Sequence, residues 1–103
     1  MYMTVSKISR QSAEPCTDTD IDTIVKAMPS FSAFRDSVVT QQAEGKIIYR
    51  SHSINGSDEM ETVTLYATQG DYDAFKVDVA FTAFAADLEA GVYNPIVVTE
   101  EVI

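Results

Sequence analysis

The side chains that offer chemistry gather on one face of two predicted strands, at residues 46–55 and 60–68. Successive side chains of a strand point to opposite faces, so the polar groups of both runs share a face. That face carries Ile48, Arg50, His52, Thr62, Thr64 and Tyr66. Guanidinium, imidazole and hydroxyl groups can orient a ligand, but we favour hydrogen bonds across an interface between two paired sheets over a catalytic centre.

Metal chemistry has little support in the sequence. The chain contains one histidine, His52, and one cysteine, Cys16, too few for a transition-metal site within one subunit. Two His52 side chains near a dimer axis remain a less favoured alternative. The spacing of Asp18, Asp20 and Asp22 resembles the start of a calcium loop, but the Gly and Glu required at its sixth and twelfth positions are missing. We expect these aspartates in the first turn of a helix, and we predict no metal and no cofactor.

The two strands are predicted to form a hairpin that is closed by residues 56–58. If the numbers of paired residues sum to about 114, Tyr49 faces Leu65 and Ser51 faces Val63. Arg50 and His52 then lie beside Thr62 and Thr64. This register makes one face of the hairpin apolar and leaves the other half polar.

The remaining patterns complete the order strand, helix, strand, strand, helix, strand. We predict a strand at 2–10, a helix that is broken at Pro29 and ends at Gly45, a turn at 69–71, a helix at 72–90 with a break near 77–80, and a well-buried strand at 96–99. This is a ferredoxin-like α+β fold, with both helices on one face of a four-stranded antiparallel sheet. We expect one domain over residues 1–103.

The bare face of such a sheet favours a homodimer, because an exposed apolar face is too large for a typical monomer. A chain of 103 residues also buries only roughly two-thirds of its unfolded surface. The net charge of −9 disfavours nucleic acid and anionic membranes. No run approaches the length of a membrane span, and the lone cysteine without a signal peptide favours the cytoplasm.

Short motifs around the hairpin carry a family resemblance. Glu44-Gly45 followed by Tyr49 resembles the Glu-Pro-Gly-x-x-x-Tyr entry to the second strand of the dimeric α/β-barrel superfamily, although Ala43 stands two residues before Gly45 and the proline is missing. Residues 64–66 and 72–75 also resemble that family's third strand and following helix. The superfamily includes antibiotic-biosynthesis-monooxygenase-like domains and stress-responsive barrels. The resemblance implies a homodimer with facing sheets and a cavity in each subunit.

The catalytic groups of that family do not transfer to this chain. Residues 74–83 lack the histidine of haem-degrading members, and the chain has no tryptophan. The family's cofactor-independent oxygenases place Asn, Trp, Tyr and Arg around an aromatic substrate. This chain offers only Tyr49, Tyr66, Tyr72 and Arg50 as residues of similar type, and none of them matches a family motif position. We assign no catalytic residue from the resemblance.

An apolar pocket between helices and sheet is the predicted ligand site. Its expected walls are Phe31, Phe34, Val38, Tyr49, Leu65, Phe75, Val79 and Phe81. Such pockets with few polar groups are the usual small-molecule sites. The leading hypothesis is an apolar-ligand-binding protein or cofactor-independent oxygenase-like enzyme. The alternative is a non-catalytic protein-interaction or regulatory module that uses its acidic surface.

Overall fold

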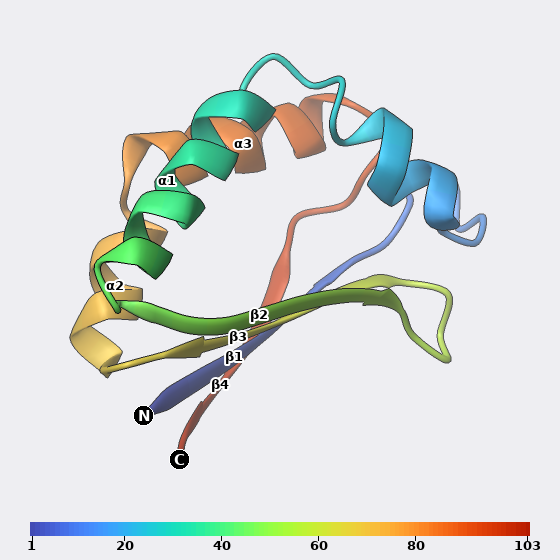
Figure 1. Cartoon of the computed structure of the whole chain (residues 1–103). Coiled ribbons are helices and arrows are strands. Elements are labelled where there is room, and N and C mark those ends of the chain that lie inside the picture. Colours follow the sequence, from blue (N-terminus) through green and yellow to red (C-terminus); the bar gives the residue numbers. More distant parts are fainter.

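The computed structural model describes residues 1–103 and has a ferredoxin-like α+β fold. Its elements are β1 (Tyr2–Ile8), the short π-helical segment η1 (Asp20–Ile24), α1 (Phe31–Ala43), β2 (Ile47–Ile54), β3 (Met60–Tyr66), α2 (Gln69–Lys76), α3 (Val79–Ala90) and β4 (Val97–Val102). The strands form one antiparallel sheet in the order β2-β3-β1-β4, and the helices cover one of its faces (Figure 1). The predicted fold class is confirmed. None of the helices is long and apolar enough to cross a membrane.

The hairpin of β2 and β3 has the predicted register. Tyr49 pairs with Leu65, and a bulge near Ile48 shifts the pairing by one residue at the start of β2. The side-chain oxygen of Asn55 accepts hydrogen bonds from the backbone N–H groups of Ser57 (2.9 Å) and Glu59 (3.0 Å). An Asn side chain that bonds its own turn in this way stabilises the loop.

Both helical regions are interrupted where the sequence indicated. Pro29 lies between η1 and α1, and Gly45, with a φ of 75°, follows the end of α1. Asp78 separates α2 from α3, and its carboxylate accepts from the N–H of Ala80 at 2.9 Å. Two short helices therefore replace one long one at each place.

Two boundaries differ from the predictions. The segment 69–71 is the first turn of α2, because the hydroxyl of Thr68 accepts from the N–H of Asp71 and caps the helix there. The last strand extends to Val102 and is not well buried. It lies at the edge of the sheet. Val97 is 61% exposed because it points to the face of the sheet that no helix covers.

The predicted facing of the strands is wrong. We call the face toward the helices the inner face and the opposite one the outer face. The inner face carries Thr4, Ser6, Arg50, His52, Thr62, Thr64 and Tyr66, whereas the outer face carries Met3, Val5, Tyr49, Ser51, Val63 and Leu65. The half-polar set predicted for a dimer face thus faces the helices. Ile48, at the bulge, and His52 stay exposed.

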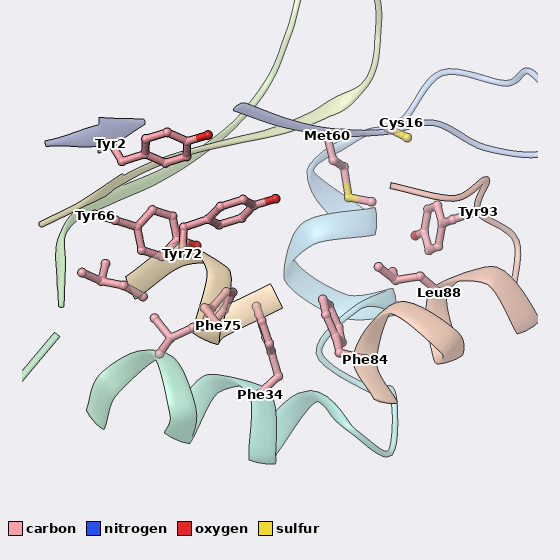
Figure 2. Packing of buried hydrophobic residues seen from close by; sticks show 12 residues of the cluster. Tyr2, Cys16, Phe34, Met60, Tyr66, Tyr72, Phe75, Phe84, Leu88 and Tyr93 are labelled. Carbon is pink, nitrogen blue, oxygen red and sulfur yellow. The ribbon is translucent and has the colours of Figure 1, made fainter. Parts of the chain in front are cut away.

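Aromatic rings fill most of the core between helices and sheet (Figure 2). Phe34 from α1 and Phe84 from α3 stack at 4.4 Å between ring centroids, with an angle of 11° between their planes. Tyr66 from β3 packs against Tyr72 (5.3 Å) and Phe75 (5.9 Å) of α2. These contacts fix the three helices relative to the inner face.

Candidate functional site

A cavity of about 520 Å³ lies between the inner face of the sheet and the helices. Its size falls within the range of roughly 300–1,000 Å³ that is typical of small-molecule sites. The walls include Ser6, Ile8, Ile21, Val25, Phe31, Phe34, Val38, Arg50, His52, Met60, Thr62, Thr64, Tyr66, Phe75, Phe81, Phe84 and Ile96. Asp18, Asp22, Lys26, Arg35, Ser53 and Glu61 complete the lining.

The helical side of the cavity is an aromatic wall. Phe34 lies at its centre, with Phe81 6.2 Å away and Phe75 6.0 Å away between ring centroids. Phe31 meets Phe84 edge to face at 6.1 Å. Rings held in offset and edge contacts form a rigid surface, against which a planar apolar molecule can pack.

Arg50 supplies a positive charge on the sheet side. Its guanidinium carbon lies 5.2 Å from the centroid of the Phe34 ring, and its Nη1 lies 3.2 Å from Nε2 of His52. No carboxylate pairs with Arg50. Burial lowers the pKa of this guanidinium from its usual value, but arginine stays protonated in proteins.

The contacts of His52 define its tautomer. Because Arg50 can only donate, Nε2 of His52 accepts, and Nδ1 carries the proton and donates to the hydroxyl of Thr62 at 2.9 Å. Burial of part of the ring, with the positive charges of Arg50 and Lys26, lowers the pKa of His52 to about 4. The imidazole is therefore neutral at physiological pH.

The titration of His52 gives a direct check of this arrangement. We expect the NMR signals of the only histidine in the chain to shift with a midpoint near pH 4. Because its pKa is lower in the folded state than the ordinary 6.5, His52 contributes stability that is present above pH 6.5 and is lost as the pH falls toward 4. Arg50→Gln should move the midpoint upward, while the exposed Arg35→Gln should not. A wild-type midpoint near 6.5 would contradict the contacts described.

Tyr66 and Thr64 form the deepest polar part of the site. Both side chains are buried. Burial raises the pKa of Tyr66 to about 12, while hydrogen bonds with Thr4 and Thr64 oppose that rise. The phenol therefore keeps its proton and can donate a hydrogen bond beside Arg50.

The structure brings only part of the predicted pocket together. Phe31, Phe34, Val38, Phe75 and Phe81 line the cavity. Three other residues predicted to line it do not. Val79 is 80% exposed at the start of α3, and Tyr49 and Leu65 lie on the outer face. Ligand binding by the first five residues stays a prediction.

Sequence reasoning missed several walls of the cavity. Ser6 and Ile8 of β1 line it because β1 is a central strand, and the period-two pattern of residues 2–8 was the available signal. Ile21 of η1 and Val25, directly after η1, also line it. Their helical spacing was visible, but no local signal indicated that η1 would cover the sheet.

A buried ion pair holds η1 in place beside the cavity. The carboxylate of Asp20 accepts from Arg10 Nη2 (2.6 Å), the Tyr93 hydroxyl (2.7 Å) and the Thr17 backbone N–H (2.7 Å). Burial alone would raise the pKa of Asp20, but these hydrogen bonds lower it overall. The aspartate predicted only as part of a helical first turn thus connects η1 to the segments that follow β1 and α3.

Comparisons with known proteins identify the fold. No protein-family model matches the chain, and no curated protein matches its sequence. An antibiotic biosynthesis monooxygenase structure matches with a TM-score of 0.64 and 10% identity, over 100% of this chain and 98% of the other. The chain has the fold of antibiotic biosynthesis monooxygenase-like proteins. The family resemblance seen in the hairpin motifs is confirmed at the level of fold.

Two further structures show the range of proteins that share this fold. SnoaB, a cofactor-independent oxygenase from Streptomyces nogalater, matches with a TM-score of 0.60 and 7% identity, over 99% of this chain and 91% of its own. A dimeric ferredoxin-like protein from an uncultured marine organism matches with a TM-score of 0.66 and 12% identity, over 100% of this chain and 94% of its own.

Proposed function

We propose that this chain binds an aromatic small molecule in the inner cavity and acts as a cofactor-independent oxygenase-like protein. The observation that carries the proposal is the cavity itself, with an aromatic wall on one side and Arg50, Thr64 and Tyr66 on the other. A mostly apolar cavity with a few converging polar groups is the usual form of a small-molecule site. The monooxygenase-like fold supports the oxygenase part of the proposal.

The cavity is better equipped for binding than for removing a proton. His52, the group that most often acts as a general base, has a pKa of about 4, and Arg50 already occupies its free nitrogen. Tyr66 keeps its proton at neutral pH. Neither His52 nor Tyr66 is therefore suited to take a proton from a compound that reacts with dioxygen here.

The distribution of acidic residues favours this proposal over an acidic interaction surface. Acidic side chains occur on η1, α1, β3, α2, α3 and β4. A groove between α1 and α2 is bordered by Asp36, Glu44, Asp71 and Asp78. All four already bind within the chain. Asp36 pairs with Arg35 and Glu44 pairs with Lys46, while Asp71 accepts from Thr68 and Asp78 accepts from Ser37. Such dispersed and internally bonded carboxylates offer less to a basic partner.

We further infer a homodimer that pairs the outer faces of two sheets. The outer face joins Met3, Val5, Val63 and Leu65 across two central strands, with Tyr49 beside them. Unpaired apolar faces of this kind mark protein interfaces. The dimeric neighbour of the same fold supports this assembly. The cavity would then lie away from the interface in each subunit.

Filling the cavity should abolish binding of an apolar aromatic probe. Ser6 lies on the inner face of β1 and lines the cavity, so Ser6→Phe should place a ring in the space. We expect an environment-sensitive naphthalene dye to become fluorescent with wild type and at least tenfold less so with Ser6→Phe. Native mass spectrometry of the purified protein would detect a ligand that is carried through purification.

Ser51→Phe is the matched control because it adds the same ring to the outer face of β2. It should leave dye binding unchanged. Equal dye signals from wild type and a folded Ser6→Phe variant, or no dye binding by wild type, would show that the inner cavity does not bind aromatic compounds.

A further inference from the structure

We propose that the ligand of the inner cavity is an aromatic oxyanion, a carboxylate or an ionised phenol, whose negative oxygen binds the guanidinium of Arg50. This inference rests on the proposed function, and it adds the charge and the chemical class of the ligand. Four properties of Arg50 and its neighbours support this proposal. They are hydrogen-bond donors without a partner, the absence of a paired carboxylate, a fixed orientation, and one adjacent hydroxyl donor.

Arg50 has more hydrogen-bond donors than its protein contacts use. A guanidinium carries five N–H groups, and the one side-chain partner of Arg50 is Nε2 of His52. Every fully buried polar side-chain atom in the chain has a partner. Nε and Nη2 of Arg50, which make no hydrogen bond, are therefore not fully buried, and Arg50 lines the cavity. A ligand oxygen could take the place of water there.

The charge of Arg50 is not neutralised inside the protein. In a chain with a net charge of −9, four of the other basic residues form ion pairs, namely Arg10, Arg35, Lys46 and Lys76. Asp18, Asp22 and Glu61 line the cavity but form no ion pair with Arg50. Arg50 is partly buried, and moving a charge out of water is costly unless the charge is paired. An anionic ligand would supply the missing partner.

The neighbours of Arg50 hold its guanidinium in one orientation. The ring of Phe34 packs below it at 5.2 Å, and Phe34 is itself stacked on Phe84. His52 accepts from Nη1 and is in turn fixed by Thr62. His52 is thus a positioning residue, and the rest of the planar fork remains for an oxyanion, a geometry that suits arginine better than lysine.

The aromatic part of the ligand has a defined place in this arrangement. Phe31, Phe81 and Phe84 line the same cavity as Arg50, so a ring bound against them can direct its acidic group toward the sheet. Tyr66, protonated at neutral pH, lies beside Arg50 as a second donor. An aromatic anion can therefore pack its ring against the phenylalanines and pair its charge with Arg50.

Two probes of nearly the same shape test the proposal, 2-naphthoate and the neutral 2-naphthamide, by isothermal titration calorimetry at pH 7. Wild type should bind naphthoate at least about tenfold more tightly, since a hydrogen bond to a charged group contributes enough for that factor or more. Arg50→Gln should remove the preference and leave naphthamide binding nearly unchanged. Lys76→Gln, which removes the positive charge of a 43% exposed side chain outside the cavity lining, should keep the preference.

The outcomes separate the two levels of the argument. Equal binding of both probes by wild type would overturn the oxyanion site and leave the proposed aromatic cavity intact, whereas binding of neither probe would overturn both. If Arg50→Gln does not fold by circular dichroism, Arg50→Lys takes its place. Arg50→Lys should keep part of the preference, and a preference that equals that of wild type would contradict a role for the guanidinium fork.

Discussion

Asp20→Asn should lower the free energy of unfolding by about 3–5 kcal/mol, because it breaks a buried ion pair from one side. The carboxylate is completely buried and accepts hydrogen bonds from Arg10, Tyr93 and Thr17. Asparagine has nearly the same shape, but its amide NH₂ cannot accept from these donors. The variant would leave Arg10 half-buried without its partner.

Urea unfolding followed by circular dichroism measures this effect. Asp22→Asn is the matched control, since Asp22 lies in the same segment η1 but is exposed. It should change the free energy of unfolding by about 0.5 kcal/mol or less. Equal stabilities of the two variants would mean that the Asp20 network contributes little to the fold.

The ionisation of Asp20 should also contribute to the pH dependence of the free energy of unfolding. The pKa of Asp20 is lower in the folded protein than its ordinary value of 3.8. The contribution of this carboxylate is therefore fully present above the ordinary pKa and is lost as the pH falls through the folded one. Asp20→Asn should remove that part of the acid dependence.

Local signals in the sequence were sufficient for the order of the elements and for the break and the end of the first helical region. Pro29 and Gly45 act on the backbone at their own positions, so the break before α1 and the end of that helix could be read directly. The register of the hairpin followed from its turn, because a short loop fixes which residues face each other.

The facing of the sheet could not be predicted from the same signals. Alternation separates Arg50 and Tyr66 from Tyr49 and Leu65, but it does not say which set the helices cover. The apolar set was assigned to the helices because a core is normally apolar. The helices instead cover the polar set, and the space left between them is the cavity. The apolar set faces outward, where a second subunit can cover it.

The role of Asp20 was hidden for a different reason. Aspartates in a first helical turn are usually exposed, and both Asp18 and Asp22 are exposed in this chain. The partners of Asp20 lie 10 residues before it and 73 residues after it. Only the folded arrangement of β1, η1 and the segment before β4 brings Arg10 and Tyr93 to the same carboxylate.

Leu65→Asp should convert the proposed homodimer to a monomer. Leu65 lies on the outer face between Met3 and Tyr49, so a two-fold pairing of sheets would bury the substituted residue of each subunit. Losing two buried leucine side chains removes about 3–6 kcal/mol of apolar burial, and two unpaired carboxylates add to the loss. We expect the dissociation constant of the dimer to rise at least about a hundredfold.

Size-exclusion chromatography with light scattering decides the assembly at micromolar concentration. Wild type should have twice the 11.3 kDa of one chain, and Leu65→Asp should have the mass of one. Val39→Asp is the control, because Val39 is an exposed apolar residue of α1, on the helical side of the molecule. It introduces the same charge and should leave the dimer intact. A wild-type mass of 11.3 kDa would show that the outer face does not pair with a second copy, whereas a dimer that withstands Leu65→Asp would place the interface elsewhere.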